Sequence, residues 1–296
     1  MRARSVSIFY DLLIAPFIEF EFMRRALVGA CALALAGSPL GVFLLLRRMS
    51  LTGDAMAHAI LPGAAVGYLI AGLSLPAMTI GGLAAGLSVA LLSGLVARFT
   101  ALREDASLAG FYLMSLALGV TILSLRGSSV DLLHVLFGNV LALDEDTLLF
   151  LAGVSTFTLL ALAVGYRALA METLDPGFLS SVSKAGGPAQ VLFLSLVVLN
   201  LVAGFHALGT LLAVGIMILP AASARLWSPD ITRMTLIAAV IGLVSSAAGL
   251  LLSYHFNLPP GPLIVLTAGG WHVVSMIFGL SGGYLRRLPP RKHLEA

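Results

Sequence analysis

The chain has 296 residues, of which 59% are hydrophobic and only 10% are charged, and its mean hydropathy is +1.04. This composition lies far from that of soluble domains and predicts one integral membrane domain over residues 1–296, embedded in lipid. The formal net charge of +3 comes from basic residues between apolar segments, where they act as topology signals, so we do not expect nucleic acid as a partner.

The N-terminal stretch, residues 1–20, lacks the pattern of a cleaved signal peptide. Its apolar residues are interrupted by Asp11, Pro16 and Glu19 before the first long apolar run begins. We therefore expect this stretch to be an amphipathic segment that lies on the membrane interface.

Apolar stretches separated by polar breaks recur along the rest of the chain, and most are long enough to cross a hydrocarbon core of roughly 30 Å as helices. We predict spans near residues 22–46, 55–72, 76–98, 106–125, 147–168, 188–204, 208–226, 233–254 and 262–282. The sequence thus predicts an all-α polytopic membrane protein with about nine transmembrane helices, within a range of eight to ten. The stretch 131–143 is too short to cross and is predicted to be a re-entrant or interfacial turn. Small residues four apart, such as Gly63 and Gly67, favour close helix packing.

Basic residues fall mostly on one side of the predicted spans. When the loop after Arg47 and Arg48 is placed in the cytoplasm, 12 of the 17 basic residues lie inside. This asymmetry predicts an outside N-terminus and a cytoplasmic tail over residues 284–296. It also makes 169–187 the longest polar cytoplasmic loop.

A short helix is expected within that loop. It should begin at Asp175 and Pro176, with the aspartate as N-cap and the proline at the first helical position.

The residues that carry chemistry lie in the run GDAMAHAILPG, at the start of the second predicted span. Asp54 and His58 are four residues apart, so a helix places both on one face, where they can hold the same ion. Pro62 lacks an N–H and leaves the carbonyl of His58 without its usual helical partner. A carboxylate with an imidazole suits zinc and other first-row divalent ions. The alternative is that Asp54 only caps a helix and His58 is a satisfied core residue.

Two ligands do not complete a four-coordinate site, so we expect a two-fold dimer to supply two copies of the pair. Asp54 lies six residues beyond Arg48, which predicts a site in the cytoplasmic half of the bilayer. His134 and His206 are weaker candidate ligands, and for each of them a packing role is the alternative.

An intramembrane enzyme is the rival hypothesis from another class. Residues 279–283 fit the G-x-S-x-G pattern, but Ser281 falls at the end of the last predicted span, where small residues are common, and no H-E-x-x-H is present. We therefore predict that the chain is not an enzyme. It also lacks G-x-x-x-x-G-K-[ST], so ATP hydrolysis would need a separate subunit. A proton-driven secondary metal transporter or a channel is the nearer alternative, although neither has a use for the capped cytoplasmic helix.

The run LLLRRMSLTGDAMAHAILPGAAVG resembles the second-helix motif of permeases from bacterial ABC importers for zinc, manganese and iron. Three further stretches agree with that family in order and spacing: SVDLLHVLFGNVLAL, DPGFLSSVSKAGG and GTLLAVGIMILPAASARL. The resemblance covers residues 20–280.

The resemblance implies a homodimeric permease in the bacterial cytoplasmic membrane, served by a cytoplasmic ABC ATPase and an extracytoplasmic metal-binding protein. It places Asp54 and His58 in the metal site, with Zn²⁺ or Mn²⁺ as the transported substrate and no permanently bound cofactor. At His206, manganese-type members tend to have an uncharged polar residue, which favours zinc over manganese. The resemblance assigns coupling to the ATPase to the loop that contains Asp175, Pro176, Gly186 and Gly187.

Overall fold

The computed structural model describes most of the chain, namely residues 10, 12–72, 74–100, 104–125, 140–183 and 185–287. Within these ranges the regular elements are helices and no strand occurs, which confirms the all-α prediction. In chain order they are α2 (Ala15–Glu19), α3 (Glu21–Leu46), α4 (Thr52–Ala71), α5 (Leu75–Phe99), α6 (Glu104–Leu125), the 3-10 helix η1 (Val140–Ala142), α8 (Glu145–Leu174), α9 (Pro176–Val182), α10 (Gly186–Leu208), α11 (Thr210–Arg225), α12 (Ile231–Phe256), α13 (Pro260–Phe278) and α14 (Tyr284–Arg287).

Seven helices of the described part are long and apolar enough to cross a membrane: α3, α4, α5, α8, α10, α12 and α13. The other two predicted spans fall on α6, whose apolar part Ala106–Gly119 is shorter, and on α11, which has 16 residues. At ~1.5 Å per residue α11 is about 24 Å long, less than a hydrocarbon core of ~30 Å. The chain is therefore a multi-pass membrane protein. The total of nine spans and the orientation of the termini stay predictions.

Some sequence-based predictions concern residues outside the described ranges. Most of the predicted re-entrant stretch, including His134, is among them, and only its end appears, as η1. Most of the N-terminal interfacial segment and of the C-terminal tail also lies outside. The short helix α2 belongs to the former, and its interfacial position stays a prediction.

The break between α10 and α11 lies at Gly209, whose φ of 92° is in the left-handed region that favours glycine. Its N–H donates to the carbonyls of Gly204 and Phe205, which ends α10. The apolar stretch from 188 to 226 is thus divided into two helices. Helix α11 begins with a buried residue, Thr210.

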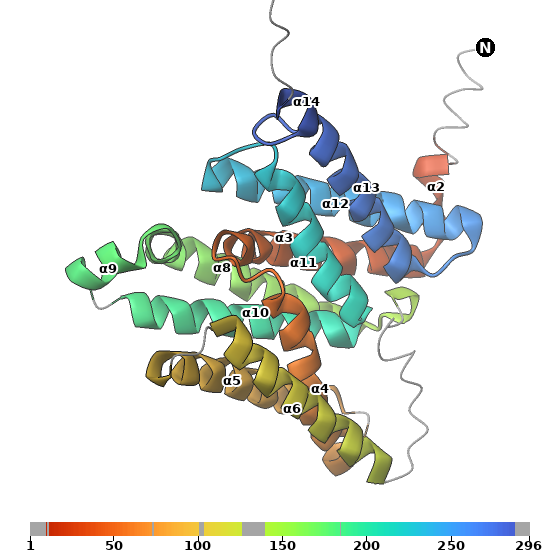
Figure 1. Cartoon of the computed structure of the whole chain (residues 1–296). Coiled ribbons are helices and arrows are strands. Elements are labelled where there is room, and N and C mark those ends of the chain that lie inside the picture. Colours follow the sequence, from red (N-terminus) through yellow and green to blue (C-terminus); the bar gives the residue numbers. More distant parts are fainter. Residues whose placement is uncertain are drawn as a thin grey trace, which may run out of the picture.

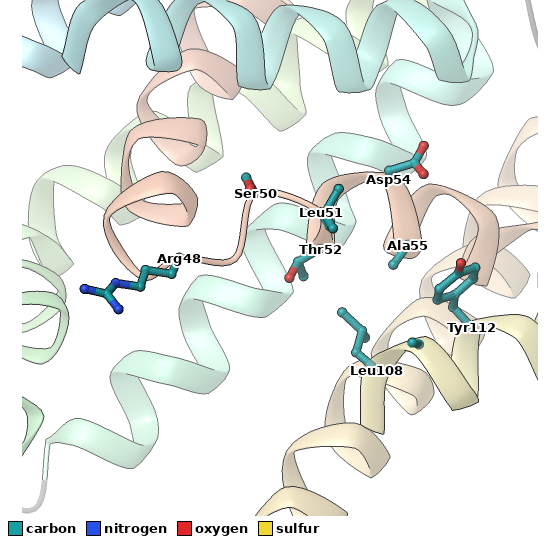
Figure 2. A pocket seen from close by; sticks show the side chains of 9 residues that line it. Arg48, Ser50, Leu51, Thr52, Asp54, Ala55, Leu108 and Tyr112 are labelled. Carbon is teal, nitrogen blue, oxygen red and sulfur yellow. The ribbon is translucent and has the colours of Figure 1, made fainter. Parts of the chain in front are cut away.

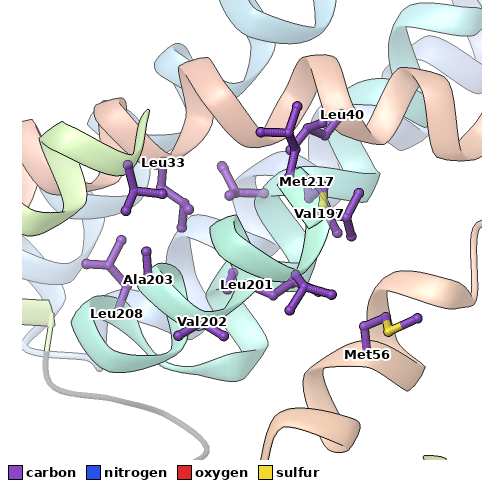
Figure 3. Packing of buried hydrophobic residues seen from close by; sticks show 14 of the residues in the cluster. Leu33, Leu40, Met56, Val197, Leu201, Val202, Ala203, Leu208 and Met217 are labelled. Carbon is purple, nitrogen blue, oxygen red and sulfur yellow. The ribbon is translucent and has the colours of Figure 1, made fainter. Parts of the chain in front are cut away.

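The core of the bundle is built mainly on α3, α10 and α11, and Figure 3 shows its apolar side chains. Leu33 and Leu40 of α3 belong to one buried cluster with Val197 and Leu201 of α10, and each is at most 2% exposed. Met217 of α11 joins the same cluster. Dispersion contacts of this kind hold helices together in lipid, where burial from water contributes little. Helix α4 contacts α10 and α11 of this core and packs more extensively on α5 and α6.

Helices α4, α5 and α6 pack on one another and form a group at the lower edge of Figure 1. A Cβ added at Gly63 would collide with the carbonyl of Gly81, and one at Gly67 would collide with that of Ala77. The close approach predicted from the Gly63 and Gly67 spacing is therefore confirmed. Backbone contact with α5 fixes one face of α4 and so orients its other faces.

The ends of α3 and α8 define the two ends of the bundle. At one end Arg47, just after α3, donates from Nε to Oγ1 of Thr173 near the end of α8, at 3.0 Å. At the other end Glu21, at the start of α3, borders the same cavity as Asp144, the N-cap of α8. The two helices therefore run in the same direction, and α9 lies at the Arg47 end.

Candidate metal site

Asp54 and His58 occupy the first two turns of α4 and share one of its faces. Nε2 of His58 lies 3.8 Å from Oδ1 of Asp54. The N-cap of α4 is Leu51, and no side chain caps the helix, so the alternative in which Asp54 only caps α4 finds no support. The carboxylate instead points outward from the helix, with its side chain 65% exposed.

The imidazole of His58 is held from the side by another helix. Its ring stacks on Tyr112 of α6, with 6.4 Å between the centroids and 27° between the planes. Nδ1 of His58 is buried and has no hydrogen-bond partner in the described part of the chain. A buried polar atom without a partner carries a desolvation cost, so His58 is not the satisfied core residue of the alternative interpretation.

Two cavities meet at Asp54. The smaller, of about 220 Å³, is bordered by both members of the pair and by the first half of α11: Asp54, Ala57, His58, Thr210, Leu211, Val214 and Gly215. The larger, of about 260 Å³, extends from Asp54 to Arg48 and Tyr112, and Figure 2 shows its lining. A small ion at the carboxylate therefore has open space on both sides of it.

The pair lies on the first two turns of α4, beside the first half of α11. Thr210 and Gly215, which face it across the smaller cavity, belong to the first half of α11. Close to that level, Ser38 of α3 donates to the carbonyl of Ile216 at 3.2 Å, and Ser38 is itself well inside its helix. The membrane-embedded position of the pair and its assignment to the cytoplasmic half stay predictions.

His206, the other predicted ligand that the structure describes, does not join the pair, and His134 lies outside the described residues. His206 of α10 approaches the carbonyl of Val202 with Nδ1 at 2.9 Å, while its Nε2 is buried without a partner in the described residues. No three His, Cys, Asp or Glu side chains of the described part gather closely enough to hold a metal. Within one copy, then, the candidate site is the Asp54 and His58 pair alone.

The predicted coupling loop contains the expected capped helix. Asp175 precedes α9 and accepts a hydrogen bond from the backbone N–H of Phe178 at 2.9 Å, and Pro176 is the first residue of α9. Gly186 begins α10, and a Cβ there would lie 2.6 Å from a carboxylate oxygen of Glu172. A Cβ at Gly187 would meet no heavy atom within 4 Å. Sequence reasoning missed Glu172, because its contact with Gly186 appears only when α8 and α10 are packed.

The serine of the rival enzyme hypothesis has a local role. Ser281 follows α13, and its hydroxyl donates to the carbonyl of Trp227 at 3.3 Å while its N–H donates to that of Leu226 at 2.8 Å. These bonds tie the loop after α13 to the end of α11. His272, on α13, instead lies 3.3 Å from the hydroxyl of Ser223.

Comparison with known proteins gives the chain its family. Residues 19–279 match the ABC 3 transport family. The manganese transport system membrane protein MntC of Halalkalibacterium halodurans is 32% identical over 287 residues, which cover 96% of this chain and 94% of that protein. The manganese import system permease protein ScaB of Streptococcus gordonii is 31% identical over 273 residues, which cover 91% and 95%.

A solved structure of PsaBC from Streptococcus pneumoniae in complex with Fab has the same fold. Its TM-score against this chain is 0.81 at 31% sequence identity, and the match covers 93% of this chain and 99% of that one. The sequence match and the structural match both extend over nearly the whole length. The chain therefore belongs to the ABC 3 transport family.

Proposed function

We propose that this chain is the permease subunit of an ATP-driven importer and that it passes divalent metal ions through a site made by Asp54 and His58. The observation that carries the proposal is a carboxylate and an imidazole 3.8 Å apart on one face of a membrane-spanning helix, next to open cavities. An ionisable side chain at membrane depth costs at least ~2.5–3.5 kcal/mol, so it is retained where it has a function.

Manganese is the first ion to test, and zinc is its competitor. The sequence-based preference for zinc depended on His206, and the described structure does not bring that residue to the pair. Two relatives are named as manganese transporters. Carboxylate ligands favour manganese and imidazole ligands favour zinc, so the pair itself accepts both ions.

A second copy of the chain completes the site in this proposal. The Asp54 side chain is 65% exposed although α4 is a candidate membrane span. Lipid is a poor neighbour for a carboxylate, whereas a two-fold partner would bring a second Asp54 and His58 against it. An ATPase subunit would dock at α9, and an extracytoplasmic metal-binding protein would deliver the ion at the opposite end of the bundle.

Uptake of radioactive Mn²⁺ into proteoliposomes that contain the permease and its ATPase tests the proposal. We expect uptake to require ATP and to be lost in Asp54→Asn, which keeps the size of the side chain but removes its charge. Asp230→Asn is the matched control, because Asp230 caps α12 through the N–H of Arg233 and asparagine caps equally well. Uptake driven by a proton gradient without ATP would instead support a secondary transporter, and normal uptake by Asp54→Asn would remove the pair from the pathway.

A further inference from the structure

Arg48 stands in an unusual position between the candidate metal site and the coupling loop. It lies in the short connection between α3 and α4 with a φ of 60°, in the left-handed region that few residues other than glycine adopt. Its side chain is exposed and makes no ion pair with any residue that the structure describes. A role as a topology signal does not explain why a cation is held at such a backbone position.

Arg48 borders two cavities, and each of them has one carboxylate in its wall. The first is the cavity of about 260 Å³ that it shares with Asp54. The second, of about 420 Å³, is bordered by Arg48, Arg47 and Glu172 among others. Figure 2 shows the guanidinium directed away from Asp54, the position that leaves that carboxylate open to an ion.

Arg48 and Asp54 line the same cavity, so the long arginine side chain has open space on its path to the carboxylate. An ionised Asp54 at membrane depth needs a positive partner whenever no metal ion is bound. A guanidinium is permanently charged and matches a carboxylate with two parallel hydrogen bonds, so it suits this task.

We propose that Arg48 is a positioning residue that acts as a displaceable counter-cation for Asp54. It pairs with Asp54 when the site is empty, and it moves to the Glu172 cavity when a metal ion takes the carboxylate. This inference rests on the proposed function, because it assumes that Asp54 binds the ion. Arg48 thereby competes with the metal and sets how readily the site fills and empties.

Glu172 connects this exchange to the coupling loop. Its carboxylate lies against Gly186, the first residue of α10 directly after that loop. A shift of the loop therefore moves the carboxylate of Glu172. This carboxylate is the group that draws Arg48 away from the metal site. When Glu172 is in place, it keeps Arg48 away from Asp54 and the metal site is open. When Glu172 is displaced, Arg48 returns to Asp54.

Equilibrium dialysis with Mn²⁺ alone, on the complete permease and ATPase complex in nanodiscs without nucleotide, tests the inference. Arg48→Asn removes the charge and keeps a residue that tolerates a positive φ. If Arg48 occupies Asp54 for about nine-tenths of the time in the empty site, this variant binds Mn²⁺ about tenfold more tightly. Glu172→Gln should bind Mn²⁺ more weakly than the wild type. Arg48→Lys keeps the charge but loses the paired hydrogen bonds, so its affinity should lie between those of the wild type and Arg48→Asn.

Arg233→Asn is the control, because it removes an exposed positive charge at the start of α12, remote from both cavities in sequence. Unchanged or weaker binding by Arg48→Asn, or shifts of the same sign in Arg48→Asn and Glu172→Gln, would overturn the inference. A purely structural role for Arg48 predicts that Arg48→Asn binds Mn²⁺ no more tightly than the wild type. Full binding by Asp54→Asn would instead overturn the proposed function.

Discussion

Gly63→Ala is expected to force α4 away from α5 and so to disturb the site that α4 carries. A Cβ at Gly63 collides with the backbone carbonyl of Gly81 and lies 2.7 Å from the Cβ of Ala85. Neither group can swing aside, because one is backbone and the other is a Cβ, so the two helices must separate. Overpacking costs about 1–3 kcal/mol. Against this, alanine gains about 1 kcal/mol over glycine in helix propensity.

Gly94→Ala on α5 is the matched control, because a Cβ there would have no heavy atom within 4 Å. It has only the propensity gain, so the two variants should differ by about 1–3 kcal/mol. For a chain of this size that corresponds to a difference of about 2–5 °C in Tm. Thermal unfolding in nanodiscs measures it, and Mn²⁺ dialysis on the same samples reports on the site. Equal Tm values for the two variants would refute the packing argument.

Two further predictions concern the ends of the bundle. Gly186→Val should displace Glu172 and raise the number of ATP molecules hydrolysed per Mn²⁺ imported. Gly187→Val should not raise this number, because its side chain enters open space. If the two variants hydrolyse the same number of ATP molecules per Mn²⁺, Glu172 has no role in coupling. Hydrogen bonding by Thr147, first from its side chain and then from its backbone N–H, lowers the pKa of Asp144 below its usual 3.8. The capped start of α8 is thus fully stabilised above pH 3.8 and loses this contribution as the pH falls through the lowered pKa. Asp144→Asn should lack that part of the acid dependence of Tm, and an unchanged acid dependence would contradict it.

Much of the architecture follows from the sequence because the bilayer imposes it. Length and apolarity located each long helix, and the Asp175 and Pro176 signal located the start of α9 to the residue. The same local logic placed Asp54 and His58 on one face of α4. These predictions succeeded because each needs only neighbours along one helix.

The rest of the site depends on contacts between helices. The stacking of Tyr112 on His58, the cavity between α4 and α11, and the contact of Glu172 with Gly186 each join segments distant in sequence. No periodicity within one segment specifies such pairs. The left-handed conformation of Arg48 was also missed, because an arginine gives no local signal for a positive φ.

The stoichiometry of bound metal tests the central claim most directly. If Asp54 and His58 from two copies hold one ion, the purified complex should bind one Mn²⁺ per two copies of this chain. Asp54→Asn and His58→Ala should bind none, while each still inserts and assembles with the ATPase, because Asp54 is exposed and His58 only partly buried. One ion for every copy of the chain, or undiminished binding in Asp54→Asn, would contradict the account.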